Sequence, residues 1–86
     1  NTRGREAMET ARLYARGELA SLLQQRRQLT NQINDLGRQI GMSGNPQTTQ
    51  SLGFRRGELL KQRSQLDNRI KQVKQQLRSY GDTQLQ

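Results

Sequence analysis

The chain has 86 residues, of which 29% are hydrophobic and 3% are aromatic, so it forms at most one small domain with a modest core. It contains neither Cys nor His, which excludes disulfides, zinc sites built from these residues, and the commonest catalytic base and thiol nucleophile. Twelve Arg and three Lys outnumber seven acidic residues, giving a net charge of +8. This surplus favours a polyanion such as nucleic acid, or an acidic protein surface, as partner, although a basic face that only keeps the chain soluble is an equal alternative.

Other classes of protein are excluded by what the sequence lacks. No apolar stretch is long enough for a transmembrane helix, and no charged segment followed by an apolar core indicates a signal peptide. No group of residues offers acid–base, nucleophilic or phosphate-binding chemistry. We therefore expect no enzyme activity, no cofactor, no metal site and no small-molecule substrate.

A first long helix is expected over residues 5–40, after a frayed start at residues 1–4 in which Thr2 can act as a cap. Apolar residues, interrupted by arginine, recur at alternating spacings of three and four between Met8 and Ile40. This pattern is typical of the seam of a coiled-coil helix. The predicted helix–helix contacts on this seam are Leu19, Leu22, Arg26, Leu29, Ile33, Leu36 and Ile40.

The charges near both ends of this helix favour the assignment. Glu6 and Glu9 lie in its expected first turns, where negative charge complements the helix dipole, and Arg38 lies in its expected last turn. Gly41 follows the last seam residue. It is therefore expected to end the helix in the left-handed conformation that glycine adopts readily.

A turn is predicted at residues 41–45, just before the only proline of the chain. Asn is a favoured N-cap and Pro a favoured first helical residue, so a second helix is expected over residues 46–80. Gly81 is expected to end it, and residues 82–86 to form a polar tail. The predicted contacts on the second seam are Leu59, Arg63, Leu66, Ile70, Val73 and Leu77.

The start of the second helix has an alternative near Thr49 or Ser51. Gly53 and Gly57 each weaken a helix by roughly 1 kcal/mol relative to alanine, so the segment before and around them is a poor helix former. An early start corresponds to a tight turn, and a late start to a longer loop.

The two starts imply two registers for the pairing of the helices. A tight turn sets Leu19 against Leu66 and Ala15 against Ile70, whereas a longer loop shifts the pairing by one heptad and sets Leu22 against Ile70. Both registers keep seam against seam, so the periodicity does not distinguish them. We favour the tight turn.

The predicted fold is therefore an all-α antiparallel two-helix coiled-coil hairpin. Its two apolar stripes are narrow, and a small chain buries only a modest fraction of its surface. We expect the fold to be completed by oligomerisation with copies of itself or by packing in a larger assembly.

Arginine occupies seam positions where Leu or Ile would pack better, most clearly at Arg26 and Arg63. One interpretation is that the stem of each arginine packs while its head extends to the edge of the seam. The other is that polar seam positions select a register or an oligomeric state at a cost in stability. Asp67 and Glu18 are the expected partners of these guanidinium groups.

Basic residues of the second helix are the candidate polyanion site. No aromatic residues are interleaved with them, so any nucleic-acid binding is expected to be sequence-independent and salt-dependent. The fourteen Gln residues could hydrogen-bond across neighbouring helices, or could reflect compositional drift. The candidate polyanion contacts are Arg55, Lys61, Arg69, Lys71, Lys74 and Arg78.

The turn sequence Gly-Met-Ser-Gly-Asn-Pro at residues 41–46, between two Arg- and Gln-rich helices, resembles helical segments of the internal virion proteins, or ejection proteins, of short-tailed bacteriophages. The resemblance covers residues 5–80 and implies a structural protein packed with others in the virion, which helps build a conduit for DNA. RNA-binding helical hairpins of the Rop type and the coiled-coil hairpin that opens hantavirus nucleocapsid proteins have the same outline.

We therefore expect a non-enzymatic structural or assembly module that packs with copies of itself or other helices, in the cytoplasm or in a virion. The alternative is a sequence-independent nucleic-acid-binding hairpin that uses the basic face of the second helix.

Overall fold

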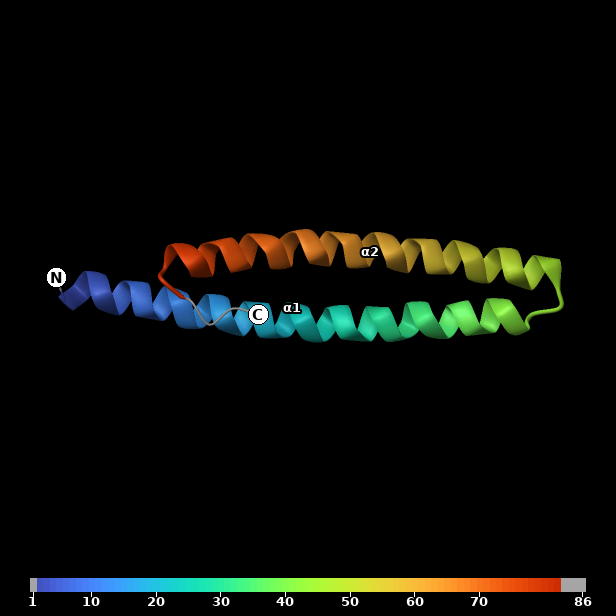
Figure 1. Ribbon diagram of the computed structural model, residues 1–86, viewed down its shortest axis with the longest axis horizontal. Helices are drawn as coiled ribbons and strands as arrows, with labels where there is room; N and C mark the ends of the chain where they lie inside the picture. Colours follow the sequence, from blue (N-terminus) through green and yellow to red (C-terminus); the bar gives the residue numbers. More distant parts are fainter. Residues whose placement is uncertain (1, 83–86) are drawn as a thin grey trace.

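The computed structural model describes residues 2–82 and consists of two long antiparallel α-helices joined by a short turn (Figure 1). Helix α1 spans Thr2–Met42 and helix α2 spans Pro46–Ser79. Together they form a rod of 66 × 15 × 15 Å. The predicted all-α helical hairpin is confirmed.

Helix α1 extends beyond both of its expected bounds. It begins at Thr2, so residues 2–4, which were expected to be frayed, are helical. As a result, no acidic residue lies in its first turn and no basic residue in its last turn. Glu6, Glu9 and Arg38 are therefore too far from the helix ends to complement the dipole as the sequence suggested, because that effect falls off within one turn.

The prediction that Gly41 ends α1 in a left-handed conformation was wrong. The helix continues through Gly41 to Met42, and Gly41 does not have a positive φ angle. The backbone N–H of Ser43 donates to the carbonyl of Ile40 at 3.3 Å, and the Ser43 hydroxyl bonds to the backbone of Asn45. The first bond satisfies a carbonyl in the last turn of the helix, and the others hold the turn, so the helix ends without a left-handed residue.

The predicted start of α2 is confirmed. Asn45 has an extended backbone, and its side-chain Oδ1 accepts hydrogen bonds from the backbone N–H groups of Gln47 at 2.9 Å and Thr48 at 3.4 Å. Pro46 follows as the first helical residue, where its missing N–H costs nothing. The alternative start near Thr49 is therefore wrong.

Gly81 ends α2 as predicted. It has a φ angle of +79° and is the only residue among 2–82 with a positive φ. Its N–H donates to the carbonyl of Arg78, and the N–H of Asp82 donates to the carbonyl of Leu77, both at 3.0 Å. These two bonds form a Schellman motif, which satisfies carbonyls that the helix itself leaves unpaired.

The core lies along the contact between the two helices. Its main cluster is toward the open end of the hairpin, where Val73 and Leu77 are fully buried and Leu19 and Leu66 pack at the margin. Among residues 2–82, seven apolar side chains are buried: Ala15, Leu22, Ile33, Leu36, Ile70, Val73 and Leu77.

The favoured register was wrong. The guanidinium of Arg63 lies 3.5 Å from the hydroxyl of Thr30. This contact fits the register that sets Leu22 against Ile70, and it lies one heptad away from the register that sets Ala15 against Ile70. The hairpin therefore has the pairing that we had associated with a longer loop.

The burial of the seam agrees with this register. Leu77 is buried in the cluster that contains Ala15, whereas the favoured register would have set it against Met8, which is 51% exposed. The reason lies in the turn: the extended backbone of Asn45 carries the chain past α1, so that α2 begins beyond the last turn of α1 (Figure 1). The turn, residues 43–45, is even shorter than the predicted 41–45, but it does not reverse the chain symmetrically.

Candidate functional site

The seam residues proposed from the sequence lie between the helices. Twelve of the thirteen are buried or half-buried, and only Arg26 is exposed. Its neighbours on the seam are apolar and offer its guanidinium no partner. Its head group leaves the seam instead.

The heads of the seam arginines turn to the same side of the hairpin. Nε of Arg26 lies 2.7 Å from Oδ1 of Asp67, as predicted, and Arg63 reaches Thr30. Asp67 and Thr30 each directly follow a seam residue of their own helix, so both lie along the same edge of the seam. The stems still pack while the charged groups reach water.

The head group of Arg56 also extends to the edge of the seam, where it contacts the backbone of α1. Its Nε donates to the backbone carbonyl of Ile33 at 3.3 Å. A Cβ atom built on Gly37 would lie 3.6 Å from this Nε, so the glycine leaves room for the arginine to lie across α1. Arg56 lies on the second seam, and Gly37 directly follows the seam residue Leu36; these two positions are the signal for the contact in the sequence.

The expectation that Glu18 pairs with a seam arginine was wrong. Oε1 of Glu18 lies 2.7 Å from Nε and 2.5 Å from Nη2 of Arg69, so the pair links α1 to α2. Arg69 had been assigned to polyanion binding, but its charge is largely neutralised by this carboxylate. Both residues lie on the side of the seam opposite to Asp67.

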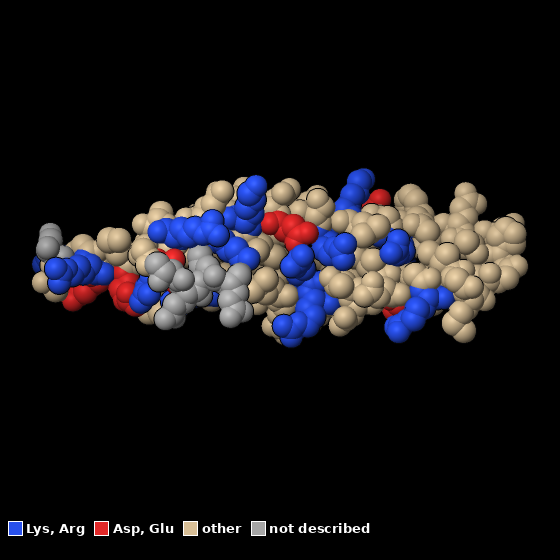
Figure 2. Space-filling model, viewed as in Figure 1, with Lys and Arg blue, Asp and Glu red and all other residues tan. Residues whose placement is uncertain are grey.

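One long side of the hairpin, which we call the basic face, gathers cations from both helices. Two adjoining hollows run along it and share Arg26 and Asp67. Figure 2 shows Lys and Arg gathered over the middle of the rod and toward its open end, whereas the turn end is uncharged. The cations of the basic face are Arg26, Arg27, Arg63, Lys71, Lys74 and Arg78.

Most of these cations have no acidic partner. Asp67 is the only acid lining either hollow, and it already pairs with Arg26. Within residues 2–82, no carboxylate forms an ion pair with any of four cations: Arg27, Lys71, Lys74 and Arg78. Their charge is therefore available to a partner.

The candidate polyanion residues divide between the two sides of the rod. Three of them, Lys71, Lys74 and Arg78, meet on the basic face. Arg69 lies on the other side, and Lys61 lies 4.0 Å from Glu58 within α2. Arg55, seven residues before Gln62, belongs to the side of Arg69 by its heptad position. The candidate surface thus loses half of its predicted residues and gains Arg26, Arg27 and Arg63.

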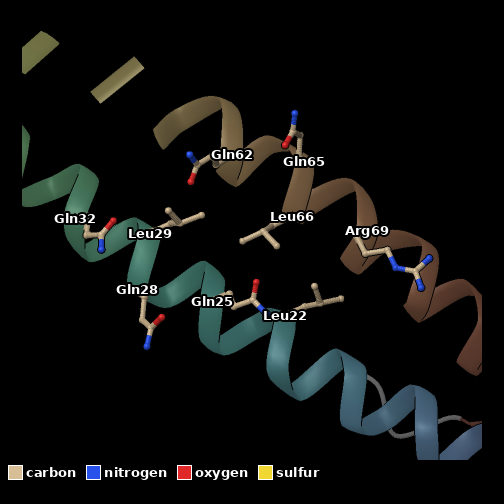
Figure 3. A pocket seen from close by; sticks show the side chains of 9 residues that line it. All are labelled: Leu22, Gln25, Gln28, Leu29, Gln32, Gln62, Gln65, Leu66 and Arg69. Atoms are coloured by element: carbon tan, nitrogen blue, oxygen red, sulfur yellow. The ribbon is translucent and has the colours of Figure 1, made fainter. Parts of the chain in front are cut away.

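The opposite long side, which we call the glutamine face, holds a groove whose lining is almost uncharged. Figure 3 shows three leucines pointing into the space between the helices, with glutamines from both helices flanking them. Arg69 is the only charged residue of this groove, and Glu18 pairs with it. The groove is lined by Leu22, Leu29 and Leu66, by Gln25, Gln28, Gln32, Gln62 and Gln65, and by Arg69.

Asp82, the last described residue, forms an ion pair with Arg16 of α1. Its side chain is 1% exposed, and Oδ2 lies 2.5 Å from Nε of Arg16. The hydrogen bond and the charge of Asp82 raise the pKa of the Arg16 guanidinium above its ordinary value. Asp82 was expected to belong to a polar tail, and this was wrong; the rest of that predicted tail, residues 83–86, lies outside the described residues.

Three further findings concern metal sites, membrane spans and similarity to known proteins. In the described part of the chain, no three His, Cys, Asp or Glu side chains are grouped so that they could hold a metal ion. Neither helix contains, within residues 2–82, a segment that is long and apolar enough to span a membrane. Comparison with protein-family models, curated proteins and solved structures finds no match to this chain.

Proposed function

We propose that this protein is a non-enzymatic assembly module, a helical hairpin that packs with copies of itself or with other helices in a larger complex. The observation that supports this best is the open leucine floor of the glutamine face. Leu29 and Leu66 are only half-buried in the hairpin and line a groove that no other element covers within the described residues. Two packed helices bury the side chains directly between them but leave the edges of their seam open to water. An apolar edge of this kind is stabilised when another layer packs on it.

The size of the core supports the same proposal. Seven buried apolar side chains are few for a rod 66 Å long. Small domains with such cores commonly rely on disulfides, a structural metal or oligomerisation. The sequence has no Cys for a disulfide and neither Cys nor His for a zinc site, so oligomerisation is the most direct of the three. A structural role is also what the resemblance to bacteriophage ejection proteins implies.

Light scattering after size-exclusion chromatography tests the proposal. We expect a particle mass above the 9.9 kDa of one chain, and a mass that does not change as salt is raised. Contacts between uncharged faces are not weakened by ionic screening, unlike contacts between exposed charges. A chain that stays monomeric at every concentration and salt would overturn packing with copies of itself, since no self-assembly would then accompany the exposed leucines.

A second function, sequence-independent binding of nucleic acid, is favoured by the one-sided placement of the cations. Arg27, Lys71, Lys74 and Arg78 have no acidic partner among the described residues, and they lie on one face together with the heads of Arg26 and Arg63. A stripe of this kind can contact consecutive phosphates without reading bases.

Fluorescence anisotropy with a labelled duplex at several salt concentrations tests this second function. Lys74→Ala should weaken binding and lower the slope of log affinity against log salt by about 1. The matched variant Lys61→Ala removes the same charge from a residue off this face, which lies near Glu58, and should change the slope less. Micromolar or weaker binding at low salt, or equal effects of the two variants, would overturn this reading.

A further inference from the structure

We propose that the glutamine face is the docking site for a second copy of this chain, laid face to face so that four helices enclose the leucine floor. This inference rests on the proposed assembly function and names its partner and its surface. It joins three properties of the face: its hydrogen-bonding chemistry, its charge and its extent.

The chemistry of the face suits a copy of itself. A two-fold interface brings identical patches together, so each patch must be complementary to itself. A glutamine amide is both a donor and an acceptor, and two rows of amides can therefore pair with each other. The groove contributes five glutamines around Leu22, Leu29 and Leu66, which supply the apolar centre of the contact.

The charge of the two sides favours the same face. Arg69 is the only charged residue lining the groove, and it is paired with Glu18 of its own chain at 2.5 Å. The basic face, by contrast, carries four cations without a carboxylate partner within residues 2–82 and would repel its own copy. Each chain has a net charge of +8, so contact through the glutamine face also keeps the two basic faces on the outside, as far apart as possible.

The face extends well beyond the glutamine groove. A second hollow shares Leu22 and Gln25 with the groove, and a third shares Tyr14 and Glu18 with the second, so that all three run along one side toward the open end. Tyr14, which lies in this side, is 78% exposed in the single hairpin. A copy that covers the whole side would therefore also cover an aromatic ring.

The area of this side is adequate for a stable dimer. A rod 66 Å long and 15 Å wide presents a projected area of about 1,000 Å² on one side. Each partner in a protein–protein interface of standard size buries about 800 Å². A copy laid along most of the glutamine face would therefore form an interface of ordinary size.

The test places like charges in the centre of the face. In Gln25→Lys/Gln62→Lys, both substituted residues are exposed and line the groove, so each copy would oppose two new cations to those of the other. The control Gln24→Lys/Gln75→Lys adds the same two charges at exposed residues outside the groove. Light scattering should give about twice 9.9 kDa for the wild type and the control, and 9.9 kDa for the groove variant.

The outcomes separate this inference from the assembly function on which it rests. A wild type that assembles but is not dissociated by the groove charges would overturn the docking site and leave the assembly function standing. A wild type that is monomeric throughout would overturn both the docking site and self-assembly. Circular dichroism must show that the groove variant keeps its helices; if it does not, Gln28→Lys/Gln65→Lys makes the same test at two other exposed groove residues.

Discussion

Replacing Gly53 and Gly57 with alanine should stabilise the hairpin. Both residues are exposed in the first half of α2, and a Cβ atom added at either one meets nothing within 4 Å. Glycine in a helix interior costs about 1 kcal/mol relative to alanine, because the unfolded chain loses more freedom on folding. The double variant should therefore gain about 2 kcal/mol in the free energy of unfolding. A change of 1 kcal/mol shifts the Tm of a chain of this size by about 4–8 °C, so we expect a rise of roughly 8–16 °C.

Thermal unfolding followed by circular dichroism at one fixed protein concentration measures this effect, since assembly would otherwise shift Tm. Gly17→Ala in α1 is a positive control, because this glycine is also helical and a Cβ there meets nothing within 4 Å. Gly81→Ala should have the opposite sign: its φ of +79° costs an alanine about 1–2 kcal/mol.

The pattern across these variants can refute the assignment of α2. If Gly17→Ala raised Tm while the changes at Gly53 and Gly57 left it unchanged, the segment from Pro46 to Gly57 would not be helical. The second helix would then start after Gly57, later than either start considered from the sequence, and the turn and cap described above would be wrong.

Three other variants test individual contacts. Asn45→Ala removes the acceptor for two backbone N–H groups and should cost about 1 kcal/mol, measured by urea unfolding. Asp82→Asn removes the ion pair with Arg16 and should lower Tm. Because the pKa of Arg16 is raised in the folded chain, the stabilisation from its charge is complete below the ordinary guanidinium pKa and is lost only at higher pH. The loss in Tm should therefore be constant between about pH 6 and 9. Asp67→Asn should lower the free energy of unfolding by less than about 1 kcal/mol, because the side chains of Asp67 and Arg26 are 44% and 50% exposed. The loss should shrink in high salt, and a larger loss that does not depend on salt would contradict a solvent-exposed ion pair.

The sequence was sufficient for the fold because each helix carries its own local signals. The alternation of spacings along each seam needs no partner to be recognised, and the Asn45-Pro46 cap and the Gly81 terminator act within one turn of the chain. The register was missed because it depends on how far the turn advances along the rod. Seven-residue periodicity is unchanged by a heptad shift, so the register depends on the turn geometry and on contacts between the helices, such as that of Arg63 with Thr30.

The candidate site was only half predictable for a related reason. The position of each basic residue around its own helix can be read from the heptad, and this would have separated Lys71 and Lys74 from Arg69. The direction in which a seam arginine leaves the core depends instead on the other helix, which supplies Thr30 to Arg63 in the register that was not favoured. The contact between Arg16 and Asp82 depends on the turn of the chain at Gly81, which no periodic pattern records.

The seam arginines connect the weakness of the single hairpin to the difference between its two sides. Arg26, Arg56 and Arg63 each replace an apolar residue that could have enlarged the core, and each delivers its charge along the same edge of the seam. These three arginines therefore make the isolated hairpin depend on a partner, and they direct the partner to the other side of the rod, where the glutamine amides and leucines lie. Replacing these three arginines with leucine should raise the free energy of unfolding of the single hairpin and should also lower the positive charge of the basic face. The polar interruptions of the seam thus explain both why the chain should assemble and which of its faces should remain outside.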